Sequence, residues 1–421
     1  MKRFFRLVPA FLCAALLSTT FLSGCGFRAS GKTPPANSSE KQLTQAQKLA
    51  DFEYMYDILR DNYPYFGVAK REGIDWLANH SAYRKDIKET RNDEEFRAML
   101  DSILQDLQNG HVSMFKSGAD SPGSYTYSRS LYNTMQGRAP WKNVMNNPKA
   151  EARYGVAGNS SVSPQSGAQE SSDQISPNNV STRMLKNNTV AYLCMNSFNH
   201  FNVEPDQKII RPFLESIGGA KALILDIRSN GGGDDAYWMN LVANLIRRPV
   251  TFTERMVFRG GAYEKPFLQS SYSGVPFFPI STLKNVPKLP PEVKTDFASW
   301  RSDTSQISPD KPVAFHGKIY LLVSGNVFSS SEKFAVFCKS TGFATIVGTR
   351  TGGDGIGCDP ALCMLPNSGY IFRFPMEMGL NPNGSSNFEA GTEPDISVQS
   401  DNVSADLENQ PAVQAVLSRV S

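Results

Sequence analysis

A strand–turn–helix pattern occurs twice in the second half of the chain and leaves few folds open. In each copy a continuous apolar run precedes a turn of small residues, and an amphipathic segment follows: KALILDIRSNGGGDDAYWMNLVANLI from residue 221 and KIYLLVSGNVFSSSEKFAVFCKSTG from residue 318. Strands that are apolar on both faces are typical of a sheet covered by helices on both sides. The sequence therefore predicts an α/β core, with ligand-binding turns beyond the strand ends.

The two turns have complementary chemistry. Glycines 231–233 allow a substrate carbonyl to approach the backbone, and the N–H groups at a helix start suit a developing oxyanion. One of the serines 329–331, at the start of the second helix, could attack as a nucleophile. Each turn alone has an ordinary explanation, as a flexible turn or a helix N-cap. Their occurrence in two matching units about 100 residues apart favours a functional site.

The N-terminus has the pattern of a lipoprotein signal. Residues 1–24 begin with basic residues, continue with an apolar stretch and end in small residues, as a secretory signal peptide does. The segment 22–25, Leu-Ser-Gly-Cys, resembles the bacterial lipobox, and the alternative is an ordinary signal peptide with a chance cysteine. Residues 25–45 are polar and rich in Pro, Gly and Ser, like a tether. We therefore expect lipidation at Cys25 and an extracytoplasmic protein on a membrane surface.

Three further regions follow the tether. Residues 46–115 are predicted to form an N-terminal helical domain, because apolar residues recur there at three- and four-residue spacings. Residues 116–185 are expected to be a polar low-complexity insert, with a mobile loop in GNSSVSPQSGAQESSDQISPNNVSTR. Residues 186–421 carry the α/β core. The net charge of +3 is too small to argue for nucleic-acid binding.

The cysteines leave more than one interpretation open. Cys194 and Cys338 lie in apolar runs and are expected to be buried thiols. Cys358 and Cys363 could close a small disulfide loop. A metal site is not expected, because no histidine lies near them in the sequence.

Four segments, in this order, carry a resemblance to a known family: ALILDIRSNGGG, LLVSGNVFSSSEKFA, ATIVGTRTGGDG and GTEPDI. They resemble the C-terminal processing (tail-specific) serine peptidases over about residues 189–397. The resemblance implies a crotonase/ClpP-like core with an N-terminal helical segment, and no metal or organic cofactor. Aligned on Glu332, the family's Ser-Ala-Ser-Glu pattern implies Ser329 as the nucleophile. It also implies the backbone N–H groups of Gly232 and Ser330 as the oxyanion hole.

One departure from the family concerns the general base that deprotonates the serine. The lysine branch has Gly-Lys-Gly after the next strand, whereas this chain has Asp354 at the lysine position, and a carboxylate cannot replace a desolvated amine. His111 in LQNGHVSMF resembles the Asp-Gly-His-Thr segment of the tricorn-core-like branch, where the histidine is the base. A structural histidine at a helix end is the alternative. His200 is a second candidate base, while His80 and His316 are expected to be structural.

A third group should orient the imidazole. By resemblance to the tricorn-like branch, Glu389 is a possible supporting acid, although it stands one residue out of register. No PDZ-like module is evident. Ser330 and Lys333 also fit the Ser-x-x-Lys motif of penicillin-binding proteins, but neither companion motif follows.

The sequence thus predicts a membrane-anchored serine peptidase that acts on peptides or unfolded proteins through an acyl-enzyme. The alternative is a catalytically inactive, lipid-anchored peptide-binding protein on a peptidase scaffold. A short distance between Ser329 and His111 would favour the enzyme.

Overall fold

The two strand–turn–helix units are adjacent in the computed structural model, which describes residues 42–116, 124–155, 176–272, 274, 276–398 and 406–420. Their strands, β4 (Ala222–Asp226) and β8 (Lys318–Val323), pair in parallel at the centre of a six-stranded sheet. The sheet order is β13-β9-β8-β4-β3-β2, and only β2 runs antiparallel to its neighbour. The outer strands are β2 (Val180–Leu185), β3 (Val190–Met195), β9 (Thr345–Gly348) and β13 (Ile396–Ser397).

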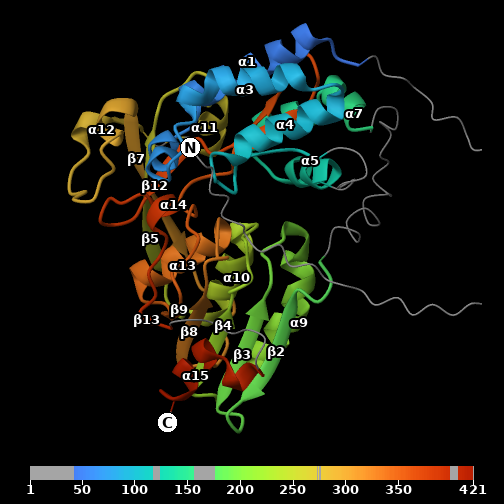
Figure 1. The fold of residues 1–421 in the computed structure, drawn as a ribbon. Helices are drawn as coiled ribbons and strands as arrows, with labels where there is room; N and C mark the ends of the chain where they lie inside the picture. Colours follow the sequence, from blue (N-terminus) through green and yellow to red (C-terminus); the bar gives the residue numbers. More distant parts are fainter. Residues whose placement is uncertain are drawn as a thin grey trace, which may run out of the picture. The chain divides into compact units, whose positions relative to one another are not determined.

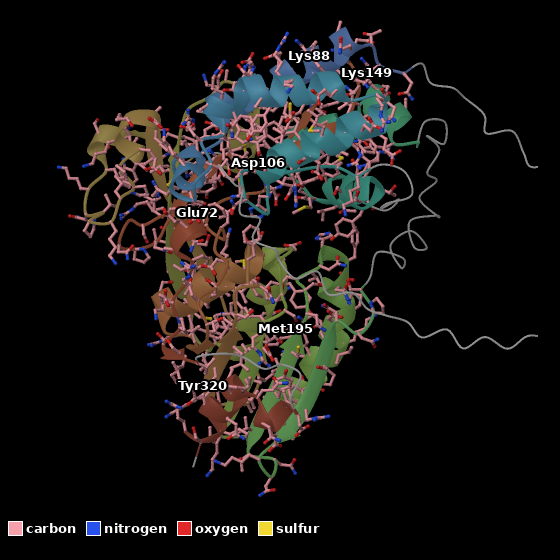
Figure 2. All side chains as sticks on the ribbon, in the orientation of Figure 1. Glu72, Lys88, Asp106, Lys149, Met195 and Tyr320 are labelled. Atoms are coloured by element: carbon pink, nitrogen blue, oxygen red, sulfur yellow. The ribbon has the colours of Figure 1, made fainter. Side chains whose placement is uncertain are left out.

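Helices cover both faces of this sheet (Figure 1). Along β4, Leu223 and Leu225 pack into a core with α9 (Val203–Ser216), α10 (Asp235–Leu245) and α13 (Ser330–Thr341). Ile224, between them, packs into a second core with α15 (Pro411–Leu417). Figure 2 shows side chains on both sides of the sheet; the labelled Met195 belongs to the first core and Tyr320 to the second. Since both faces are buried, the strands are continuously apolar, and the predicted α/β core is confirmed.

The N-terminal region is helical, as predicted. Thr44 caps the first helix in a capping box with Gln47, and Asn92 caps the fourth. These helices share one hydrophobic core with two smaller antiparallel sheets, so the described residues from Leu43 onward form one compact unit. The helices are α1 (Gln45–Asn62), α2 (Phe66–Arg71), α3 (His80–Glu89) and α4 (Asp93–Gln105).

The smaller sheets connect this helical region to the core. One has the order β1-β11-β10 and the other β12-β5-β7-β6. The first consists of β1 (Ser113–Met114), β10 (Ala361–Met364) and β11 (Ile371–Phe374). The second consists of β5 (Val250–Phe258), β6 (Phe278–Pro279), β7 (Ser299–Ile307) and β12 (Glu377–Leu380).

The region expected to be a polar insert contains three helices in its described part: α5 (Ser124–Thr134), α6 (Ala139–Met145) and α7 (Pro148–Arg153). They are anchored by buried aromatic residues, among them Tyr125 and Tyr132 on α5 and Trp141 on α6. Trp141 is fully buried, donates to the Pro360 carbonyl at 2.7 Å and packs edge-on against Phe267. The expected mobile loop lies largely in 156–175, outside the described residues, and its last residues form β2.

The four core cysteines are free thiols, so the possible bond between Cys358 and Cys363 is not formed. Cys363 is fully buried within β10. Across the described ranges, no helix has the length and hydrophobicity needed to cross a membrane. The remaining short elements are η1 (Leu77–Asn79), η3 (His200–Asn202), η4 (Ile280–Thr282), η5 (Leu407–Asn409), α11 (Lys265–Ser271), α12 (Val293–Asp296) and α14 (Asn387–Ala390).

Candidate active site

Ser329 lies at the sharp turn between β8 and α13. Its backbone has φ 59° and ψ −129°, a region that side-chain-bearing residues rarely occupy and that costs about 1–3 kcal/mol. The turn is fixed by two hydrogen bonds: the Ser329 N–H donates to the Gly353 carbonyl at 3.2 Å, and the Lys333 N–H donates to the Ser329 carbonyl at 2.9 Å. A strained strand-to-helix turn of this kind resembles the nucleophile elbow of hydrolases, which exposes a serine hydroxyl at the edge of a sheet.

His111 lies against this hydroxyl although 218 residues separate the two in sequence. The chain leaves α4, turns at 109–112 and enters β1, which pairs with β11 and so fixes the turn. His111 Nε2 is 2.9 Å from Ser329 Oγ, a hydrogen-bonding distance that favours the enzyme over the inactive alternative. The imidazole also packs on Phe328, with ring centroids 4.6 Å apart. The structure therefore brings the predicted nucleophile and base together.

Asp354 completes the arrangement. Its Oδ2 lies 2.8 Å from His111 Nδ1 and 3.1 Å from Asn109 Nδ2, and its Oδ1 accepts from the Tyr65 hydroxyl at 2.7 Å. Because a carboxylate only accepts, His111 Nδ1 must carry the proton, which leaves Nε2 free to accept from Ser329. The residue that replaces the family lysine is thus the group that orients the histidine.

The proposed supporting acid, Glu389, requires a correction. It lies on α14, and its two carboxylate oxygens accept from Arg71 Nε and Nη2, each at 2.7 Å. Arg71 also pairs with Glu292. Glu389 is therefore bound by Arg71 at the surface and is not the acid that contacts His111. That acid is Asp354. A signal for this was present in the sequence: an aspartate between glycines in the turn after β9 stands at the chemically active edge of the sheet.

The three hydroxyls of the serine run contact different partners. Ser329 contacts His111, whereas Ser330 Oγ donates to Asp235 Oδ1 at 2.6 Å. Ser331 Oγ lies 2.6 Å from the Asn230 carbonyl and 2.8 Å from the Phe328 carbonyl. Ser331 therefore joins the serine turn to the glycine turn, and only Ser329 is placed for attack.

The glycine turn lies against the nucleophile, as expected, but the donor assignment changes. A Cβ on Gly232 would come within 2.8 Å of Ser329 Cβ and 2.9 Å of the Ser330 nitrogen, so only glycine fits. The Gly232 N–H, however, donates to Asn230 Oδ1 at 2.9 Å, which removes it from the oxyanion hole. Within the described residues, the N–H groups of Ser330, Gly231 and Gly233 have no acceptor, and all three residues line the cavity.

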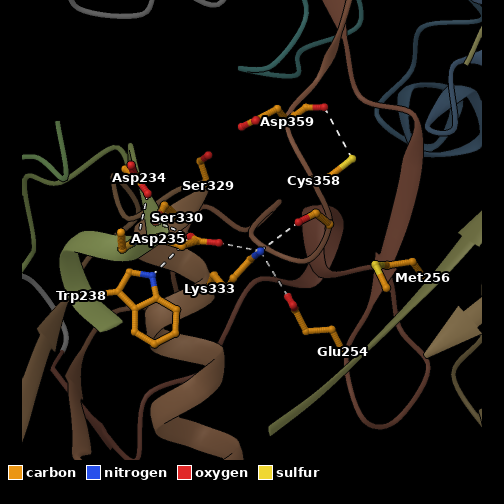
Figure 3. Close-up of polar contacts among 12 residues, drawn as sticks. Asp234, Asp235, Trp238, Glu254, Met256, Ser329, Ser330, Lys333, Cys358 and Asp359 are labelled. Atoms are coloured by element: carbon orange, nitrogen blue, oxygen red, sulfur yellow. Dashed lines mark hydrogen bonds and ion pairs between the residues drawn. The ribbon is translucent and has the colours of Figure 1, made fainter. Parts of the chain in front are cut away.

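Lys333 links three parts of the site through contacts of its side-chain ammonium (Figure 3). Its Nζ contacts Asp235 Oδ2 at 2.9 Å, the Gly357 carbonyl at 2.9 Å and Glu254 Oε1 at 3.7 Å. Burial disfavours the charge on Lys333, but the two carboxylates outweigh burial and hold the pKa of Lys333 above its usual value. A lysine that stays protonated cannot act as a general base, which argues against the Ser-x-x-Lys interpretation.

The other candidate histidines are engaged elsewhere. His200 lines the same cavity, and its Nδ1 contacts Asp234 Oδ2 at 2.5 Å. His80 pairs with Glu53, and His316 Nε2 accepts from Arg247 Nη2 on a surface turn. Of the four histidines, all within the described residues, His111 is the one that contacts Ser329.

A cavity of about 530 Å³ opens beside Ser329. Its wall opposite the serine turn consists of α5 and the start of α6, with Tyr127, Leu131, Tyr132, Met135 and Arg138. The part of the chain expected to be a polar insert therefore shapes the candidate substrate site. Within the described ranges, no group of three His, Cys, Asp or Glu side chains is placed to hold a metal ion.

A nucleophile elbow, a Ser–His–Asp relay and unpaired N–H donors on an α/β core define the class of serine hydrolases. Residues 189–398 match the model of Peptidase family S41, and residues 44–105 match the Tricorn protease C1 domain. The chain belongs to peptidase family S41, a family of serine-type peptidases. The tail-specific resemblance, including its tricorn-like branch, is confirmed.

Solved structures agree on the fold. A protein assigned as a peptidase, from Parabacteroides merdae ATCC 43184, is 18% identical, with a TM-score of 0.55 over 89% of this chain and 96% of that one. Mature CPAF in complex with lactacystin is 14% identical, with a TM-score of 0.51 over 84% of this chain and 94% of that one. No curated protein matches the sequence.

Proposed function

We propose that this protein is a membrane-anchored, extracytoplasmic serine peptidase that hydrolyses peptide bonds in peptides or unfolded proteins. The observation that carries the proposal is the unbroken relay from Ser329 Oγ through His111 to Asp354, with contacts of 2.9 and 2.8 Å. The membership in family S41 supports the reaction class. The same relay speaks against the inactive peptide-binding alternative, because a scaffold without turnover has no need of an aligned base.

The reaction follows from the positions of the groups. Ser329 Oγ attacks the substrate carbonyl carbon while His111 Nε2 takes the hydroxyl proton, and Asp354 stabilises the imidazolium that forms. The oxyanion is held by the Ser330 N–H and an unbonded N–H of the glycine turn. His111 then gives its proton to the leaving amine, and the C–N bond breaks to leave an acyl-enzyme. Water, deprotonated by His111, attacks this ester and releases the acid and Ser329.

Peptide cleavage by the Ser329→Ala variant is the direct test. We expect residues 43–421, which form one compact unit, to cut an unstructured peptide pool, and Ser329→Ala to cut at background. Ser330→Ala is the matched control, because it keeps the backbone N–H and loses only the Asp235 contact. Mass spectrometry of the products measures all three. No cleavage by the parent would favour the peptide-binding alternative, and equal loss at both serines would overturn the assignment of Ser329.

The membrane anchor is a separate part of the proposal, supported by the lipobox-like sequence before Cys25. Cys25→Ser in the full chain should abolish incorporation of a labelled fatty acid and move the protein from the detergent phase to the aqueous phase. Cys13→Ser, in the apolar stretch of the signal, is the control and should leave both unchanged. If Cys25→Ser still partitions like the parent, an uncleaved signal helix is the better explanation of the anchor.

A further inference from the structure

The charged side chains that line the candidate active-site cavity are mostly paired with one another. Arg138 Nε contacts Asp359 Oδ2 at 2.8 Å, and Lys333 is held by Asp235. His200 contacts Asp234. The charge of each paired group is already balanced by its partner within the protein, so these groups attract a charged substrate only weakly.

Arg373 is different. It lies on β11, opposite Ser113 in the antiparallel pair with β1, and it lines the same cavity as Ser329 and His111. Its Nε donates to Ser113 Oγ at 3.2 Å, and its Nη2 donates to the Gly110 carbonyl at 3.0 Å. Both acceptors are neutral. Within the described residues, Nη1 has no acceptor and the guanidinium has no carboxylate partner.

The position of Arg373 brings this charge close to the chemistry. Gly110, which accepts from Nη2, immediately precedes His111 in the chain. The two neutral hydrogen bonds fix one edge of the planar guanidinium, while Nη1 remains available. Arg373 is half-buried where it lines the cavity, and burial lowers the pKa of its guanidinium. A half-buried cation that faces the cavity without an anion is available for a charge-assisted hydrogen bond, which a carboxylate brought by a ligand can accept.

We propose that Arg373 binds a carboxylate of the substrate near the scissile bond, so that the enzyme prefers acidic peptides. The carboxylate can come from an Asp or Glu side chain or from a free C-terminus, and both present the same two oxygens to the guanidinium. The inference rests on the proposed peptidase function and specifies its substrate class.

The test uses fluorogenic decapeptides that differ only by a Glu-to-Gln exchange at each position in turn, each made with a free and an amidated C-terminus. The parent should cleave a peptide with the matching carboxylate about 10- to 100-fold faster in kcat/KM than its neutral twin, as expected for a charge-assisted hydrogen bond. An effect of the Glu exchange identifies a side chain, and an effect of amidation identifies the terminus.

Three variants separate recognition from support of the fold. Arg373→Gln keeps a donor for the Gly110 carbonyl but no charge, and should reduce the acid preference to about 1. Arg373→Lys keeps the charge without the planar fork and should retain part of it. Arg183→Gln, at an exposed position on β2, removes the same charge elsewhere and should change nothing. If Arg373→Gln lowers kcat/KM for the acidic and the neutral peptides by the same factor, Arg373 only stabilises the turn that carries His111, and the proposal is wrong.

A binding measurement keeps this inference distinguishable from the peptidase proposal. The Ser329→Ala variant, with and without Arg373→Gln, is titrated against labelled peptides of the same set by fluorescence anisotropy. Selective binding of acidic peptides that depends on Arg373 supports the inference even if the parent cleaves nothing. Cleavage by the parent without any acid preference overturns the inference and leaves the peptidase function intact.

Discussion

At the scale of single residues, the relay depends on how tightly Asp354 is held. Its φ of 57° is left-handed, and three side chains, Tyr65, Asn109 and His111, hold its carboxylate. Asp354 is buried, so its two oxygens have little access to water and must be satisfied by these donors. Tyr65 and Asn109 therefore position Asp354 rather than contact the reacting atoms. This arrangement ties the N-terminal helical region to the serine turn.

Replacing Asp354 by Asn should lower kcat by about 10²- to 10⁴-fold with little change in fold. An amide at this position can donate to His111 Nδ1 and so stabilise the wrong tautomer, in which Nε2 carries the proton and cannot accept from Ser329. Steady-state cleavage of a peptide, together with thermal unfolding, measures the effect. Glu389→Gln is the control: it breaks a partly exposed ion pair and should leave kcat nearly unchanged. The reverse order of effects would restore Glu389 as the supporting acid.

At the scale of elements, the sequence predicted those parts whose signal is local. The strands β4 and β8 and the helices after them were predictable because continuous apolar runs and helical spacing are read within about ten residues. Ser329 and His111 were found through resemblance. The role of Asp354 was missed because its partner His111 lies in the turn before β1, about 240 residues away. The position of Asp354 between glycines indicated the active edge of the sheet but not the histidine that it contacts. Helices α5 and α6 were missed because tertiary contacts stabilise them, such as that between Trp141 and the Pro360 carbonyl.

A second feature at this scale is the link between the two turns of the site. Lys333 on α13 binds Asp235 on α10 and the Gly357 carbonyl in the turn that carries Asp354. One buried ammonium therefore fixes the nucleophile helix, the glycine-turn helix and the aspartate turn at once (Figure 3). Because removing it would leave the buried Glu254 and the half-buried Asp235 without a counter-charge, we expect Lys333→Ala to disturb the site although Lys333 is not the base.

At the scale of the whole molecule, several buried carboxyl groups make stability depend on pH. Burial raises the pKa of Glu332, Glu254 and Glu377 from 4.5 to about 7 in each case. Glu332 is fully buried, and its Oε1 accepts from Asn387 Nδ2 at 2.8 Å and Thr392 Oγ1 at 2.6 Å. Between pH 4.5 and 7 the folded protein thus binds more protons at these groups than the unfolded chain does.

We therefore predict that these groups make the free energy of unfolding fall as pH rises from about 5 to 8, since their contribution is full below the unfolded pKa and lost through the folded one. Glu332→Gln, which cannot ionise, should reduce that fall by on the order of 1–3 kcal/mol in urea unfolding at pH 5, 6, 7 and 8. Asp395→Asn is the control. Despite burial, Lys339 and the Ile346 N–H lower the pKa of Asp395, so its contribution is lost only below about pH 4. This control should therefore shift stability equally at all four pH values, and a Glu332→Gln variant with the slope of the parent would show that Glu332 stays ionised in the folded protein.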